Sequence, residues 1–152
     1  MRIVRLEAWP IQLALSEPYT IAYETVDRVD NVFVRLVTDG PHLGLGCAAP
    51  DEAVCSETPA GALACLSGEI AGRVIGADAL RPAKLLDGLG YLLAAHPAAV
   101  AAVDMALVDL MGKRAGLPAF RLLGGYRTRF RTSVTIGICP ADQTVARARE
   151  LV

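Results

Sequence analysis

Hydrophobic and polar residues alternate with a period of two in several runs within the first fifty residues, loosely in the first run. Apolar side chains recur at every second position over residues 3–9 and 11–15, and again over residues 31–37 and 43–49. The sequence Thr38-Asp39-Gly40-Pro41 has the composition of a tight turn and joins the last two runs as a hairpin. The pattern therefore predicts an antiparallel three-stranded meander.

Residues 16–28 interrupt this alternation. They contain Pro18, the aromatic residues Tyr19 and Tyr23, and several acidic residues. A connection of this length is longer than a hairpin requires, and such loops are usually functional or mobile. We therefore predict a long loop that displays aromatic side chains.

From Thr58 the hydrophobic period lengthens to 3.6, which predicts helices. Thr58 is suited to cap a helix that begins at Pro59 and places Leu63, Leu66, Ile70 and Val74 on one face. A second helix is predicted from Arg81-Pro82 to Ala95 and a third from Pro97 to the stop at Gly116-Leu117-Pro118, with a short turn after it at residues 119–123. The meander followed by a three-helix bundle is an α+β arrangement.

Gly124-Gly125 separates this region from one further strand and helix. Residues 131–138 are predicted to form a strand, and Pro140 opens a helix that contains Val145 and Leu151. A parallel strand needs neighbours on both sides and helices over both faces, so one βα unit is the start of a barrel or doubly wound sheet. On its own it leaves a strand edge unpaired and an apolar helix face uncovered. We predict two domains, residues 1–125 and the start of a second at residues 126–152.

Composition limits the class of protein. The chain is 53% apolar and 20% charged, which excludes disorder, and fifteen basic residues against sixteen acidic ones argue against a nucleic-acid partner. The longest uncharged run, residues 88–103, is shorter than the roughly 20 residues of a membrane span and contains His96 and Pro97. Charges within residues 1–7 do not suit a signal peptide. We expect a soluble, cytoplasmic protein with no membrane partner.

The cysteines and the basic residues at the glycine pair suggest no site of their own. Cys47, Cys55, Cys65 and Cys139 are far apart and form no Cys-x-x-Cys pair, so we expect four reduced, buried thiols rather than a zinc site or disulfides. Basic and aromatic residues alternate near the joint, a pattern that can bind single-stranded nucleic acid. The run is short, so ion pairing at the joint is the preferred interpretation. Its members are Arg121, Tyr126, Arg127, Arg129, Phe130 and Arg131.

Several motifs resemble a known family. Gly44-Leu45-Gly46-Cys47-Ala48-Ala49-Pro50 resembles the capping domain of the enolase superfamily, in its mandelate racemase/muconate lactonizing enzyme subgroup. The helix Ala101-Ala102-Val103-Asp104-Met105-Ala106-Leu107-Val108-Asp109-Leu110, followed by Gly116-Leu117-Pro118 and Leu122-Leu123-Gly124-Gly125, is similar to the signature helix of that subgroup. Residues 17–25 and 31–36 are closest to dipeptide epimerases.

The resemblance implies a fold and a chemistry. It implies an enolase-type capping domain followed by a (β/α)7β TIM-like barrel, of which this chain holds only the first βα unit. Such isomerases remove a proton from the carbon beside a carboxylate and stabilise the resulting enolate on Mg²⁺. The expected substrate is a small-molecule carboxylate or a dipeptide, and a homo-oligomer is expected. Racemase, epimerase and cycloisomerase activities all remain open.

The resemblance also assigns substrate specificity to two loops of the capping domain, residues 16–28 and 50–57. The candidate specificity residues are Tyr19, Ile21, Tyr23 and Glu24 in the first loop and Asp51 and Glu52 in the second. Aromatic faces and carboxylates both attract cations, so these side chains suit an ammonium group or a bound side chain. The alternative is a first loop that folds back with its tyrosines over apolar surface. Asp51, Glu52 and Glu57 either attract a cation or are simply solvated.

No catalytic residue and no metal ligand of the family is assigned in this chain. The resemblance places the catalytic lysines and metal carboxylates on later barrel strands, and the only lysines here are Lys84 and Lys113, expected on solvated helix surfaces. Asp104 and Asp109 lie five residues apart on one helix and do not converge. Cys47 stands where many relatives have Glu. We expect the N-terminal part of a Mg²⁺-dependent isomerase, inactive and metal-free by itself. The alternative is a non-catalytic capping module used for binding or assembly.

Overall fold

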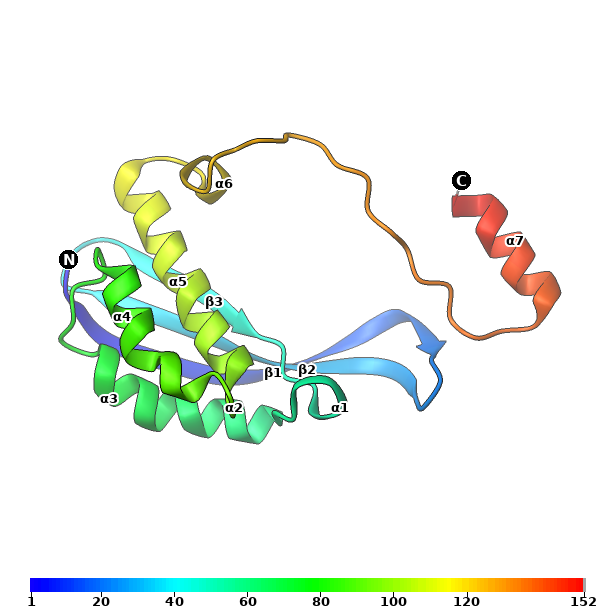
Figure 1. The fold of residues 1–152 in the computed structure, drawn as a ribbon, viewed down its shortest axis with the longest axis horizontal. Helices are drawn as coiled ribbons and strands as arrows, with labels where there is room; N and C mark the ends of the chain where they lie inside the picture. Colours follow the sequence, from blue (N-terminus) through cyan, green and yellow to red (C-terminus); the bar gives the residue numbers. More distant parts are fainter. Residues whose placement is uncertain (152) are drawn as a thin grey trace. The chain divides into compact units, whose positions relative to one another are not determined.

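The protein is described by a computed structural model that covers residues 1–151 (Figure 1). Strands β1 (Ile3–Thr20), β2 (Thr25–Thr38) and β3 (Leu43–Ala48) form one sheet in the order β1-β2-β3. The helices follow: α1 (Glu52–Cys55), α2 (Pro59–Cys65), a π-helical segment (Leu66–Ile70), α3 (Ala71–Val74), α4 (Pro82–Leu89), a 3₁₀ turn (Gly90–Leu92), α5 (Pro97–Ala115), α6 (Ala119–Leu122) and α7 (Ala141–Leu151). The predicted α+β order of an antiparallel meander followed by helices is confirmed.

The chain divides into two compact units. The first comprises residues Met1–Ile11 and Asp30–Gly125 and contains the core of the sheet and helices α1 to α6. The second comprises residues Gln12–Val29, which form the outer part of the β1–β2 hairpin, together with residues 126–151. The predicted domain boundary after Gly125 remains a prediction about the domains of the whole protein.

The core of the first unit lies between one face of the sheet and the helices that cover it (Figure 1). Alternate residues of β2, namely Val32, Val34 and Leu36, are fully buried, as the period-two pattern predicts. β2 pairs with β3 in an antiparallel register from Val32 opposite Ala48 to Val37 opposite Leu43. The helices contribute apolar side chains to the same core, and the largest share comes from α5: Ala99, Val100, Ala102, Val103, Ala106, Leu107 and Leu110.

The Gly-x-Gly motif allows α5 to lie directly on β3. A Cβ atom at Gly44 would lie 2.1 Å from the carbonyl oxygen of Ala106, and one at Gly46 would lie 1.9 Å from that of Ala102. Real Cβ atoms do not approach an oxygen so closely, so only glycine fits at either position. The motif that carries the family resemblance is therefore a packing device between a strand and a helix.

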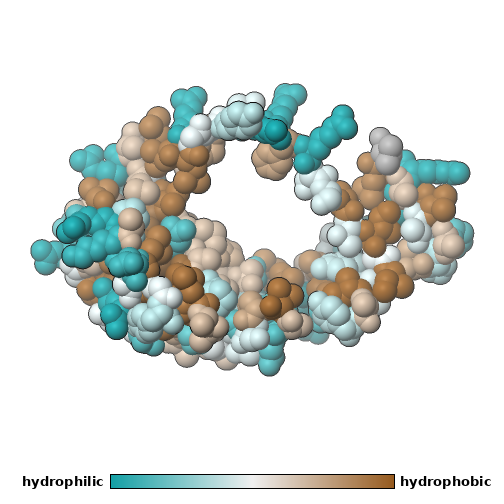
Figure 2. Space-filling model, in the orientation of Figure 1, coloured by the Kyte–Doolittle hydropathy of each residue, from teal (hydrophilic) through white to brown (hydrophobic). Residues whose placement is uncertain are grey.

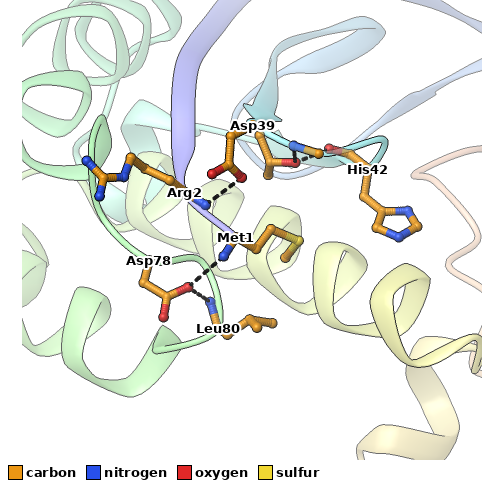
Figure 3. A network of polar contacts seen from close by, with 8 residues as sticks. Met1, Arg2, Asp39, His42, Asp78 and Leu80 are labelled. Carbon is orange, nitrogen blue, oxygen red and sulfur yellow. Dashed lines mark hydrogen bonds and ion pairs between the residues drawn. The ribbon is translucent and has the colours of Figure 1, made fainter.

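The start of β1 is fixed to the segment before α4 by polar contacts (Figure 3). The backbone N–H of Arg2 donates to the Asp39 carboxylate at 2.9 Å, and the amino group of Met1 lies 3.5 Å from Asp78 Oδ1. Asp78 also accepts a hydrogen bond from the backbone N–H of Leu80 at 3.1 Å. That bond, with the nearby amino terminus and Arg81, holds the pKa of Asp78 below its usual value.

Two sequence predictions about secondary structure are wrong. The predicted loop of residues 16–28 is mostly strand, because β1 runs to Thr20 and β2 begins at Thr25. Pro18 is tolerated there because β1 is an edge strand, where a missing N–H breaks no ladder on the open side. The predicted strand at residues 131–138 does not form. Within residues 1–151 this segment joins no sheet, and its one backbone contact with β1 is the N–H of Ile138, which donates to the carbonyl of Thr20 at 2.7 Å.

The helix predictions are confirmed with small changes of length. The helix after Thr58 includes a π-helical segment, and the one after Arg81 ends at Leu89 before a 3₁₀ turn. α5 ends at Gly116, which has a left-handed φ of 66°, as the sequence predicts. α7 has no buried residue, and Val145 is 50% exposed, so the predicted uncovered apolar face is present.

Candidate functional site

The tip of the β1–β2 hairpin carries the first set of predicted specificity residues. The backbone N–H of Ile21 donates to the carbonyl of Glu24 at 2.9 Å, which closes a tight turn over residues 21–24. The hydroxyl groups of Thr20 and Thr25 lie 2.9 Å apart at its base. The turn is therefore held by its own hydrogen bonds.

The four candidate side chains at this tip differ in exposure. Tyr23 is 63% exposed and Tyr19 is 39% exposed, whereas Ile21 is half-buried. Glu24 is exposed, and within residues 1–151 its carboxylate makes no ion pair or hydrogen bond. An exposed phenol ring beside an unpaired carboxylate is suited to contact a cation. Within residues 1–151 Tyr23 does not fold back over apolar surface, whereas Tyr19 is partly covered, so both interpretations of this tip remain predictions.

A groove lies within the second unit, between the end of β1 and the segment that leads into α7. It has a volume of about 420 Å³ and is lined from one side by residues 17–20 and from the other by residues 134–139. Arg147 of α7 forms an ion pair with Glu17 at 2.8 Å, and this carboxylate raises the pKa of the guanidinium. Gly137 packs so closely on Tyr19 that a Cβ at Gly137 would lie 2.9 Å from the Cβ of Tyr19. Tyr19 therefore forms part of a groove wall.

The second predicted loop contains a short helix that the sequence analysis did not predict. Asp51 caps α1, because its Oδ1 accepts from the backbone N–H of Ala53 at 3.0 Å and from that of Val54 at 3.2 Å. Glu52 is exposed in the first turn of this helix, where a carboxylate is electrostatically favoured. An Asp followed by helix-forming residues was the signal available in the sequence. Asp51 thus shapes the loop, and Glu52 is the acidic group that remains exposed.

Glu57 closes the same loop and is buried rather than solvated. It is only 2% exposed, and its Oε2 accepts from the backbone N–H of Ala98 at 2.7 Å, in the first turn of α5. Its other oxygen faces Nδ1 of His96 at 3.4 Å, a contact too poorly aligned to count as a hydrogen bond. Glu57 therefore connects the loop to α5, and the prediction that it attracts a cation or is solvated is wrong.

The residues described do not fit a magnesium site. No group of three His, Cys, Asp or Glu side chains within residues 1–151 lies close enough together to hold a metal ion. Asp109 instead accepts from the backbone N–H of Leu45 at 2.9 Å and from Lys113 at 2.6 Å. Lys113 also donates to the carbonyl of Leu43 at 2.8 Å, so this pair links α5 to β3.

The thiols are only partly as predicted. All four cysteines are free, but only Cys65 is buried, and burial raises the pKa of both Cys65 and Cys47.

Hydrophilic side chains stand out along the segment after α6 (Figure 2). Within residues 1–151 the arginines near the joint form no ion pair, so pairing at the joint remains a prediction for the whole protein, and Arg127 lies over the ring of Tyr126 at 5.5 Å.

The length and hydropathy of the helices decide whether any of them could span a membrane. No helix in the described part of the chain is both long enough and apolar enough to cross a bilayer.

Comparison with known proteins finds one family and a consistent group of relatives. Residues 4–124 match the N-terminal domain of mandelate racemase / muconate lactonizing enzyme. An L-Lys-D/L-Arg epimerase from Desulforapulum autotrophicum is 45% identical over 150 residues, which are 99% of this chain and 42% of that protein. A hydrophobic dipeptide epimerase from Enterococcus faecalis is 33% identical over an alignment of 153 positions, which covers 100% of this chain and 43% of that protein.

Solved structures give the same fold. The dipeptide epimerase from Methylococcus capsulatus, complexed with Mg and the dipeptide L-Arg-D-Lys, superimposes with a TM-score of 0.89 at 38% identity, over 99% of this chain and 43% of that one. The epimerase from E. faecalis, complexed with Mg and L-Leu-L-Tyr, gives a TM-score of 0.91 at 32% identity, over 99% of this chain and 42% of that one. The chain thus spans about two fifths of the length of the relatives it matches.

Proposed function

Because the chain belongs to the family of the N-terminal domain of mandelate racemases and muconate lactonizing enzymes, we propose that it is the substrate-recognition part of a dipeptide epimerase. The observation that carries this proposal is the match of almost the whole chain to dipeptide epimerases in both sequence and fold. The hairpin tip and the loop around α1 are the elements proposed to contact the substrate.

The proposed substrate is a dipeptide with cationic side chains. The epimerases from D. autotrophicum and M. capsulatus, at 45% and 39% identity, are both named for L-Lys-D/L-Arg. In this chain Glu24 is an exposed carboxylate without a partner among residues 1–151, and Tyr23 beside it presents an open ring. A carboxylate and an aromatic face together favour a lysine or arginine side chain over a neutral one. Glu52, exposed on α1, is the second acidic group proposed to face the substrate.

The proton-transfer groups and the Mg²⁺ ligands are proposed to lie outside the residues described here. Residues 1–151 supply no convergent set of metal ligands. Of the two lysines, Lys113 is engaged with Asp109 and Leu43, and Lys84 lies on the exposed surface of α4. We therefore propose that this chain by itself catalyses no epimerisation and that it recognises substrate only as part of a larger enzyme. The cytoplasm is the proposed location of that enzyme.

The test is a hybrid enzyme. Residues 1–125 of this chain are joined to the corresponding C-terminal remainder of the M. capsulatus epimerase. Epimerisation of L-Arg-L-Lys and of the neutral L-Ala-L-Leu is followed by exchange of the α-proton in D₂O by NMR. We expect the hybrid to act on the cationic dipeptide and the isolated chain to act on neither.

Variants of the hybrid test the role of Glu24. In Glu24→Gln we expect kcat/KM to fall about fivefold for L-Arg-L-Lys and to change little for L-Ala-L-Leu, because one exposed charge contact is lost. Asp87→Asn, the same change of charge on α4, is the matched control and should leave both values unchanged. Equal losses on both substrates would contradict the assignment of Glu24, and turnover by the isolated chain would contradict the proposed function.

A further inference from the structure

A hollow in the first unit lies between α3 and α4 and belongs to neither specificity loop. Its volume is about 440 Å³, close to that of a small-molecule site. The residues that line it come from α3, from α4 and from the segment that joins them: Arg73, Val74, Ala77, Asp78, Arg81, Lys84, Leu85 and Gly88.

The rim of this hollow carries an excess of positive charge. Arg73, Arg81 and Lys84 are all exposed, and none lies within ion-pair distance of a carboxylate in residues 1–151. Arg73 lies over the ring of Tyr91 at 4.8 Å, which orients its guanidinium without neutralising it. Asp78 is the one acidic residue of the lining; its carboxylate is bonded to the Leu80 N–H, lies close to the amino group of Met1 and also attracts Arg81. The cations therefore outnumber the acids, although the whole chain carries a net charge of −1.

The wall of the hollow is apolar. Ala77 and Leu85 are half-buried and supply its accessible apolar surface, and the fully buried Val74 lies behind that surface. A free inorganic anion gains nothing from such a wall, and an uncharged apolar molecule gains nothing from the rim. Charge and wall together fit a molecule with one anionic end and one apolar end.

We propose that this hollow binds a small organic carboxylate with an apolar body. Its carboxylate lies between Arg81 and Lys84, with Arg73 completing the positive rim. Its apolar body contacts Ala77 and Leu85. The binding is non-covalent, and Arg81 supplies a planar, permanently charged donor of the kind that pairs with carboxylates.

The position of the hollow separates it from the proposed substrate site. Asp78 lies beside the start of β1, where Arg2 is bonded to Asp39 at the end of β2. α1 follows the opposite end of β3, where Ala48 pairs with Val32 (Figure 1). The proposal therefore does not rest on the proposed function.

The test titrates the full chain with octanoate at low salt and follows backbone amide signals by NMR. We expect saturable shifts confined to residues of α3, α4 and their connecting segment, and a Kd that rises with added salt because exposed charges are screened. Acetate lacks the apolar body, octanol lacks the charge, and octylammonium reverses it. All three should bind far more weakly at this site.

Substitutions decide whether the rim is responsible. Arg81→Ala and Lys84→Ala are each expected to raise the Kd for octanoate about threefold, and the double variant about tenfold. Arg121→Ala removes an exposed arginine that does not line the hollow and should leave the Kd unchanged. Octanoate shifts that are absent, scattered over the surface, equal for octanol, or insensitive to the double variant would overturn the proposal.

Discussion

Gly46 offers the sharpest test of the packing between β3 and α5. In Gly46→Ala the new Cβ would lie 1.9 Å from the Ala102 carbonyl oxygen, about 1.5 Å inside the 3.4 Å at which ordinary contact begins. The obstructing atom is backbone, so no side-chain rotation relieves the clash. Either α5 moves away from the sheet or β3 bends.

The loss of unfolding free energy depends on the other core contacts that α5 makes. Its buried residues, among them Leu107 and Leu110, contact the same core, and a gap of half an ångström to one ångström already forfeits a quarter to a half of the dispersion attraction at each contact. Overpacking a core usually costs about 1–3 kcal/mol, and a rigid backbone obstacle puts this variant at or above about 3 kcal/mol. A domain of this size would then lose about 10 °C or more in Tm.

Urea unfolding followed by the fluorescence of the single tryptophan, Trp9, measures this loss. Gly44→Ala, whose Cβ would lie 2.1 Å from the Ala106 oxygen, should lose a similar amount of unfolding free energy. Gly68→Ala is the matched control, because nothing lies within 4 Å of its Cβ, and it should gain about 0.5 kcal/mol as a helical alanine. Removing a side chain from α5 cannot help, since the clash is with the main chain. A Gly46→Ala variant within about 1 kcal/mol of the parent, below the usual range for overpacking, or one rescued by Ala102→Gly, would refute the reasoning.

Three further predictions concern polar groups. Glu57→Ala should lose about 2 kcal/mol of unfolding free energy, because the Ala98 N–H loses its acceptor, whereas Glu57→Gln keeps an acceptor and should lose less in the same urea assay; equal losses would contradict the assigned contact. The pKa of Asp78 is lowered in the folded protein. Its carboxylate therefore makes its full contribution to the free energy of unfolding above the ordinary aspartate pKa near 4, and this contribution is lost as the pH falls through the folded-state pKa. Asp78→Asn should thus be less stable than the parent at neutral pH and equal to it in acid, and a difference that persists in acid would count against this. Added Mg²⁺ should leave the Tm of the chain unchanged, since residues 1–151 hold no ligand set; a rise in differential scanning fluorimetry would reveal a missed site.

The secondary structure that depends on local pattern was predictable. The alternation in residues 31–37, the Thr38–Pro41 turn and the proline starts of three helices each give a signal within a few residues. These elements formed where they were predicted. The hairpin arm was missed because Pro18 and the polar residues around it mark a loop locally, and only pairing with β2 supplies the hydrogen bonds that make it a strand. The predicted strand at residues 131–138 failed for the converse reason, since within residues 1–151 the segment joins no sheet that would pair its strand pattern.

The candidate site shows the same division. Tyr19, Tyr23, Glu24 and Glu52 are exposed, as a role in recognition requires. The local pattern contains a capping signal at Asp51, which precedes helix-forming residues, but it offers no means to separate Glu52 from Glu57. In the structure Asp51 caps α1 and Glu57 is buried against α5, and only the burial of Glu57 has no signal in the local pattern.

The sequence by itself determined the order of the meander and the main helices, the family and the absence of the catalytic lysine motif, because these follow from residue types and their spacing. Only the tertiary structure decided why Gly44 and Gly46 must be glycine, which acid remains free, and that Arg73, Arg81 and Lys84 surround one hollow. The physical reason is that clashes, burial and electrostatic fields depend on distances between residues far apart in the chain. Spacing along the sequence does not contain those distances.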